Sequence, residues 1–186
     1  MLMKEIIVRA LLFAGREDIA KTLSEDSSSQ GEAAEAVETL LYCANAAEDE
    51  LSRYWFPLEY AEVIRSDTHK FKYSDLAFPP LKILSVEDEK GNALEYEVAP
   101  DGFTAKATSV RVRYTHSPKK KELTDASEYG DRLGADIPAL GAAAEYCLIN
   151  GEMQLSEALE NRYLAAVERA RRLPKPGGYV PPRRWV

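Results

Sequence analysis

The chain has 186 residues, a net charge of −7, an apolar share of 45% and a charged share of 30%. These values are ordinary for a globular protein with a sizeable core, and they argue against a disordered chain. Every apolar run is far shorter than the roughly 20 residues that a membrane span needs. Arg9 interrupts the first of these runs, so we expect neither a membrane segment nor a signal peptide.

The first part of the chain has the apolar spacing of helices. We predict a helix from Lys4 to about Ala14, a further turn or two over 17–23, a polar loop over 24–31, and a long helix over 32–54. Pro57 follows and ends that helix. The two cysteines, Cys43 and Cys147, lie within helical patterns, which favours buried free thiols over a disulfide.

The middle of the chain alternates polar and apolar residues with a period of two, which predicts strands. The expected strands cover residues 62–65, 70–74, 82–87, 94–98, 103–107 and 109–115. The third and fourth are expected to face each other across a tight turn at Gly91. Short connections between these strands predict an antiparallel meander.

The last third returns to a helical pattern after a long polar connection over 115–137, a length typical of functional or mobile loops. Helices are expected over 139–150 and 155–173, and the prolines after residue 173 exclude helix there. The predicted fold class is therefore α+β, an α-helical bundle with an inserted antiparallel β-meander and an extended C-terminal arm. In residue numbers we expect one domain over 1–173, with helices in 4–54 and 138–173 and an insert at about 60–116, and an arm over 174–186.

Charge is unevenly distributed along the chain. Residues 25–59 carry nine acidic side chains against one basic one, and residues 162–186 carry seven basic side chains against one acidic one. Surfaces of opposite sign could bring copies of the chain together head to tail. Solvated helix faces explain the same charges equally well. The candidates for contacts between subunits are Glu35, Glu38, Arg169, Arg171 and Arg172.

We searched the sequence for catalytic and metal-binding patterns. The only histidines are His69 and His116, both in the β-region, where a structural role is the simpler interpretation. No His or Cys pair has zinc spacing, and no Gly-x-Ser-x-Gly motif is present. We therefore predict that the protein is not an enzyme and uses no cofactor and no metal.

Two basic clusters, 119–121 and 183–185, could touch nucleic acid, but the chain is acidic overall and neither cluster lies on a recognisable reading helix. The C-terminal arm has aromatic and apolar residues that could anchor on a partner, with arginines for charged hydrogen bonds. Its candidate partner-binding residues are Tyr179, Val180, Arg183, Arg184 and Trp185. The alternative is a terminus that folds back on its own domain.

The order of these elements resembles a known family. The resemblance lies in Trp55-Phe56-Pro57, in the run from Leu76 through Phe78-Pro-Pro-Leu81 to Asp88, in residues 91–96 and 110–114, and in Ile137-Pro-Ala-Leu140. This layout resembles the head-to-tail adaptor (connector) proteins of tailed bacteriophages, of the tail-tubular-protein-A type. It covers most of residues 1–173 and rests on order and spacing.

The resemblance implies a structural virion protein at the head–tail junction, made in the cytoplasm of the bacterial host. It implies a homo-oligomeric ring, typically a dodecamer, with the portal protein and a tail or neck protein as partners. The helices would form the ring wall, the β-unit would face the tail, and the C-terminal arm would reach the portal. Genomic DNA would pass through the channel without sequence-specific binding, and no membrane would be involved. The alternatives are a small soluble enzyme or regulator with a site near His69 or His116, or a DNA-packaging accessory protein.

Overall fold

A computed structural model describes residues 1–25 and 31–172. The fold class is mixed α+β, as the sequence predicts. Contacts between Cα atoms divide the chain into two compact units, Met1–Glu48 with Lys120–Val186, and Asp49–Lys119. We call them the helical unit and the β unit. The expected insert at 60–116 lies inside the β unit.

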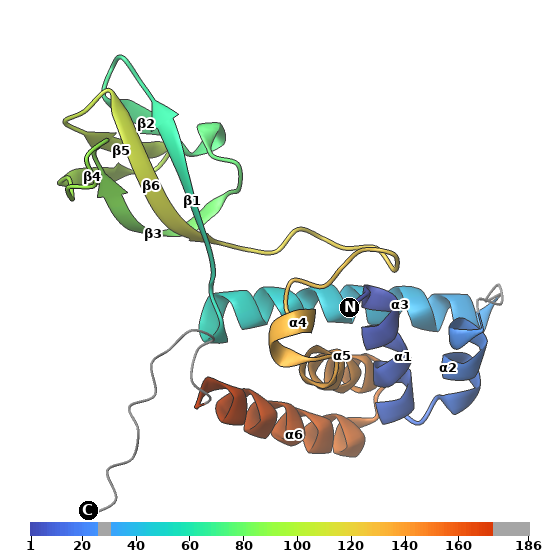
Figure 1. Ribbon diagram of the computed structural model, residues 1–186. Helices are drawn as coiled ribbons and strands as arrows, with labels where there is room; N and C mark the ends of the chain where they lie inside the picture. The colour runs from blue at the N-terminus through green and yellow to red at the C-terminus, as the bar shows by residue number, and fades with distance from the viewer. Residues whose placement is uncertain (26–30, 173–186) are drawn as a thin grey trace, which may run out of the picture. The chain divides into compact units, whose positions relative to one another are not determined.

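Over residues 1–25 and 31–172, six helices belong to the helical unit, and Figure 1 labels them. They are α1 (Met3–Phe13), α2 (Glu17–Ser24), α3 (Glu32–Glu50), α4 (Gly130–Leu133), α5 (Asp136–Ile149) and α6 (Met153–Arg171). The helices expected from apolar spacing are present, with ends that shift by up to a few residues. The four-residue α4 is too short for periodicity to reveal, and the sequence analysis missed it.

α5 is the most buried helix of this unit because apolar side chains occupy all of its sides. Ala139, Ala142 and Ala143 have no exposed surface. A Cβ atom at Gly141 would lie 3.2 Å from the Ala47 Cβ and 3.2 Å from the Tyr163 Cε2. Small residues on α5 therefore let α3 and α6 approach it closely, which is how a helix that is apolar all round is accommodated.

The long connection predicted as functional or mobile is bonded to the start of α1. The Met3 amide donates to the Asp125 carbonyl at 2.9 Å, and the Lys4 amide donates to the Leu123 carbonyl at 3.0 Å. The Ser127 amide donates to the Met1 carbonyl at 3.0 Å. We call residues 120–129 the strap, since they join the first and last parts of the helical unit through the main chain.

The β unit contains six strands in two three-stranded antiparallel sheets, ordered β1-β6-β3 and β2-β5-β4. The strands are β1 (Leu58–Arg65), β2 (Lys70–Lys72), β3 (Pro80–Glu87), β4 (Tyr96–Ala99), β5 (Gly102–Ala105) and β6 (Ser109–His116). A π-helical turn, Leu51–Trp55, comes first, and a 3₁₀ turn, Tyr73–Asp75, follows β2. The long predicted helix thus ends as a π-helical turn just before Pro57.

The antiparallel pairing is confirmed, but the predicted meander is wrong. β3 and β4 share only an isolated bridge between Glu87 and Ala93, and β6 lies between β1 and β3 instead. The Asp88 Oδ1 accepts hydrogen bonds from the Lys90 and Asn92 amides, each at 2.8 Å, so the turn at Gly91 forms as a closed polar loop. The strands diverge after this turn because β4 pairs with β5, where its residues face the buried Phe103.

Nine buried residues form the core of the β unit: Ile64, Phe71, Leu76, Val86, Phe103, Ala105, Val110, Val112 and Tyr114. The rings of Phe71 and Phe103 stack with centroids 5.1 Å apart. A Cβ at Gly102 would lie 2.0 Å from the Phe71 carbonyl oxygen, so only glycine allows β2 and β5 to approach in this way.

Candidate assembly surfaces

The predicted subunit contacts form two separate surfaces on the helical unit. Glu35 and Glu38 are exposed in the first half of α3, and Arg169, Arg171 and Arg172 are exposed at the end of α6. Figure 1 shows that the start of α3 and the end of α6 lie at opposite ends of this unit. The structure therefore does not bring the acidic and basic candidates together within one chain.

The length of α6 alone is large compared with the range of screened electrostatic forces. α6 has 19 residues, which at 1.5 Å per residue gives a length of about 28 Å. Charges on a protein surface are screened over about 8–10 Å at physiological salt. The Arg171 Nη1 lies 3.2 Å from the Glu168 Oε1, an exposed pair one turn apart that contributes little to stability.

The residues predicted for the C-terminal arm lie outside the described part of the chain. These are Tyr179, Val180, Arg183, Arg184 and Trp185. Their assignment to partner binding stays a prediction.

The two histidines have different surroundings in the β unit. The His116 ring stacks on Phe78 with centroids 4.2 Å apart, and its Nδ1 lies 2.9 Å from the Ser117 carbonyl oxygen. His69 has a φ of 58°, unusual for a residue other than glycine, and it lines an open hollow of about 890 Å³ together with Glu95 and Glu97. His116 is therefore packed as an aromatic side chain, whereas His69 forms part of a turn beside a hollow.

Two lysines of the cluster 119–121 make contacts within their own units. The Lys119 Nζ lies 5.0 Å from the centroid of the Phe78 ring, and the Lys121 Nζ lies 2.8 Å from the Glu128 Oε1. Lysines engaged in this way have less freedom to bind phosphates, which weakens the nucleic-acid interpretation of the cluster.

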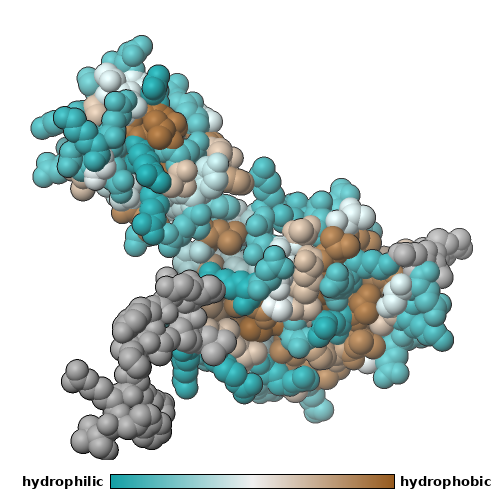
Figure 2. Space-filling model, viewed as in Figure 1, coloured by the Kyte–Doolittle hydropathy of each residue, from teal (hydrophilic) through white to brown (hydrophobic). Residues whose placement is uncertain are grey.

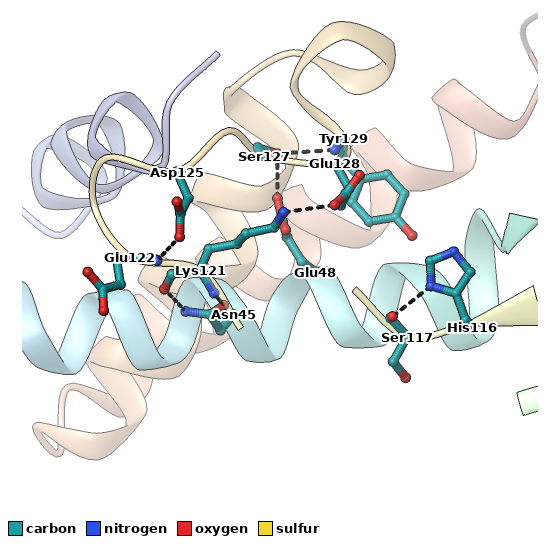
Figure 3. A network of polar contacts seen from close by, with 10 residues as sticks. All are labelled: Asn45, Glu48, His116, Ser117, Lys121, Glu122, Asp125, Ser127, Glu128 and Tyr129. Atoms are coloured by element: carbon teal, nitrogen blue, oxygen red, sulfur yellow. Dashed lines mark hydrogen bonds and ion pairs between the residues drawn. The ribbon is translucent and has the colours of Figure 1, made fainter. Parts of the chain in front are cut away.

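A buried carboxylate in the helical unit was not singled out from the sequence. Glu48 is 1% exposed, and Figure 3 shows that Ser127 of the strap donates a hydrogen bond to its Oε1. The Ser127 Oγ also accepts from the Tyr129 amide at 3.1 Å. Burial raises the pKa of Glu48, and the bond from Ser127 and the nearby Lys121 ammonium oppose that rise. The signal was present in the sequence, since Glu48 stands four residues after Ala44 and three before Leu51, on the apolar stripe of the helix.

One turn earlier, Asn45 fixes the other end of the strap to α3 (Figure 3). The Lys121 amide donates to the Asn45 Oδ1 at 2.7 Å, and the Asn45 Nδ2 donates to the Lys121 carbonyl at 3.0 Å. The side-chain amide thus pairs with a backbone segment as a neighbouring strand would. Asn45 and Glu48 together attach the strap to one face of α3.

Neither the family models nor the curated proteins match the chain. Within residues 1–25 and 31–172, no group of three or more His, Cys, Asp or Glu side chains could hold a metal ion. In the same part of the chain, no helix is long and apolar enough to cross a membrane.

Proposed function

We propose that this chain is a head-to-tail adaptor of a tailed bacteriophage, a structural subunit of a ring between the portal and the tail. The observation that carries the proposal is the placement of opposite charges at opposite ends of the helical unit. Such a unit has complementary ends, and contacts between unlike surfaces of identical subunits close into rings when the rotation between subunits permits.

In this proposal the acidic side chains of α3 face the basic end of α6 in the next subunit. Glu35 and Glu38 are exposed, and no lysine or arginine lies within one helical turn of either residue along α3. Arg169 and Arg172 are exposed at the other end of the unit. Electrostatic attraction would align the copies head to tail and would weaken as salt is added.

The remaining parts of the chain have separate roles in the ring. The β unit would meet the tail or neck protein, and residues 174–186 would reach the portal through Tyr179, Val180, Arg183, Arg184 and Trp185. DNA would cross the ring without sequence-specific contacts, and the net charge of −7 would limit its adhesion to the wall. The proposed site of the mature protein is the virion.

Imaging of the full chain tests this proposal. The purified chain is examined by negative-stain microscopy alone and after mixing with the portal protein encoded by the same genome. We expect rings on the portal, and a monomer or weak association in its absence. A matched variant, Arg169→Glu with Arg172→Glu, should reduce ring formation and leave the circular dichroism spectrum unchanged. Absence of both rings and portal binding at every salt concentration would contradict the proposal.

A further inference from the structure

Apolar side chains are exposed at the turn between α5 and α6. Leu148 is 50% exposed, Ile149 is 56% exposed and Met153 is 62% exposed. Leu155 is the fourth large apolar residue that reaches the surface in this turn. We call residues 148–155 the corner. Figure 2 shows hydrophobic residues at the surface of the helical unit in several places, and the corner concentrates four of them within eight residues.

The fold of the helical unit does not require these apolar side chains. The turn is made by Gly151 with a φ of 78°, and the Glu152 amide closes it by donating to the Cys147 carbonyl at 2.8 Å. The Asn150 Nδ2 donates to the Tyr146 carbonyl at 2.8 Å. Polar and glycine residues therefore form the turn, and the exposed apolar surface remains available to a partner.

Acidic side chains follow the corner along α6, while the one glutamate inside it is paired: the Arg16 Nη2 lies 3.6 Å from the Glu152 Oε1. Residues 145–160 contain four glutamates and no lysine or arginine, whereas residues 162–172 contain four arginines and one glutamate. The basic end of α6 complements the macrodipole of its own helix, as is common. A helix N-terminus stabilises acidic side chains mainly in its first turn. The first turn of α6 contains no acidic residue, so the macrodipole does not explain Glu157 and Glu160, which lie in later turns.

These observations favour a second copy of the chain as the partner that binds the corner. Acidic side chains repel nucleic acid and anionic lipid, and the complementary charge lies further along the same helix, since Arg169 is nine residues after Glu160, or about 14 Å by the helical rise. That end cannot fold back onto the corner, because α6 is a continuous helix. A second copy of the chain can supply it.

The geometry points to the corner as a self-association surface that receives the basic end of α6, Arg169 and Arg172, from a second copy. Met153 and Ile149 of the corner provide the apolar part of this contact, and Glu157 and Glu160, which follow the corner on α6, provide its charge. The inference rests on the proposed function, since it names where neighbouring subunits of the ring touch. Figure 1 shows the corner at the start of α6, at the opposite end of this helix from its basic end, so the basic end of one copy would contact the corner of the next in addition to the acidic residues of α3.

Sedimentation velocity of the full chain over a wide concentration range tests the inference. We expect weak, salt-sensitive self-association that Met153→Asp weakens about tenfold or more, as expected for loss of a buried apolar anchor. Aspartate is favourable at the first residue of a helix, so this variant should fold normally. Val63→Asp is the matched control, since Val63 is 61% exposed but lies in the β unit, and it should associate as the unchanged chain does.

A charge exchange adds specificity. Glu157→Arg with Glu160→Arg makes both ends basic, and Arg169→Glu with Arg172→Glu makes both ends acidic. Each double variant alone should lose association, and an equal mixture of the two should regain it. Adding Met153→Asp to both double variants should abolish the regain, which separates a specific contact from general attraction between opposite charges.

Two results would overturn the inference. One is that the unchanged chain stays monomeric at every concentration tested. The other is that it associates and the corner variants associate equally well. If the unchanged chain stays monomeric, imaging on the portal decides the ring proposal independently. If the corner variants associate equally well, the ring proposal survives with a different interface.

Discussion

The helical unit and the β unit are held together by different kinds of contact. In the helical unit, polar side chains on α3 bind a strap that comes more than 70 residues later in the chain, as in the pair Asn45 and Lys121. In the β unit, a small core depends on a few large rings, above all Phe71 and Phe103. The comparison teaches that each unit has its own source of stability, so a change in one should leave the other folded.

The largest expected effect is the loss of an aromatic ring from the β unit. Phe103→Ala removes a side chain that is 1% exposed and stacks on Phe71. We expect a loss of about 4 kcal/mol in the stability of this unit, typical of a buried phenylalanine replaced by alanine. Hydrogen exchange followed by mass spectrometry should show lost protection in β1–β6 and unchanged protection in α1 and α5.

The matched control is Val98→Ala. Val98 pairs with Phe103 across the two strands but is 68% exposed, so the change should cost less than about 0.5 kcal/mol. If Phe103→Ala also removes protection from α1 and α5, the two units fold as one, and the comparison is wrong.

The next effect breaks the polar attachment of the strap in the helical unit. Asn45→Ala removes two hydrogen bonds to the Lys121 backbone and leaves partly buried polar groups without partners. We expect a loss of about 2 kcal/mol in the stability of the helical unit, with the β unit unaffected. Urea denaturation followed by circular dichroism at 222 nm, which reports mainly on the helices, measures this loss.

Asn150→Ala is a close control for that experiment. Both asparagines donate from Nδ2 to the carbonyl four residues earlier at 2.8 Å, and Asn45 alone of the two also binds the strap. Equal losses for the two variants would show that the strap contacts contribute nothing.

The helices were more predictable from the sequence than the pairing of the strands. Apolar spacing located α3 and α6 within a few residues, because each helix buries one face whatever its neighbours are. Alternation located β6, but it gives no information on which strand lies beside it. The tight turn at Gly91 favoured a hairpin, and tertiary packing around Phe103 separated the two strands instead.

The candidate surfaces were predictable to a similar degree. A charge count along the sequence identified Glu35, Glu38 and Arg169 as exposed positions of opposite sign. It could not show that they lie at opposite ends of one unit, since that depends on how the helices pack. Exposed apolar residues such as Met153 were also missed, because a helical pattern assigns them to a buried face until the partner helices are known.

A smaller effect concerns the protonation of Glu48. Burial raises the pKa of this carboxyl in the folded chain above its ordinary 4.5, so protons stabilise the folded state. The contribution of Glu48 is fully present below 4.5 and is lost as the pH rises through its folded pKa. Glu48→Gln removes this dependence and keeps an acceptor for Ser127. We therefore expect the unchanged chain to lose stability relative to the variant as the pH rises from 4.5 to 8. The free energy of unfolding of Glu48→Gln minus that of the unchanged chain should increase over this range.

Urea denaturation at a series of pH values measures that difference. Glu38→Gln serves as the control, because Glu38 lies on the same helix and is exposed, and its difference from the unchanged chain should stay constant with pH. A constant difference for Glu48→Gln as well would mean that its carboxyl titrates alike in the folded and unfolded chains.

The smallest effect is a rate of thiol labelling, and it returns to the comparison of the two units. Cys43 and Cys147 are free and buried, and both belong to the helical unit. Burial raises the pKa of Cys43 from 9.0 to about 12 and that of Cys147 to about 11, so at pH 8 the reactive thiolate is scarcer by roughly a thousandfold and a hundredfold. Labelling with iodoacetamide at pH 8 should therefore require opening of the helical unit. Asn45→Ala should accelerate it and Phe103→Ala should not, since only the first change weakens the unit that covers the thiols. Equal acceleration by both variants would mean that opening of the β unit exposes the helical core, and the two units would then share one source of stability.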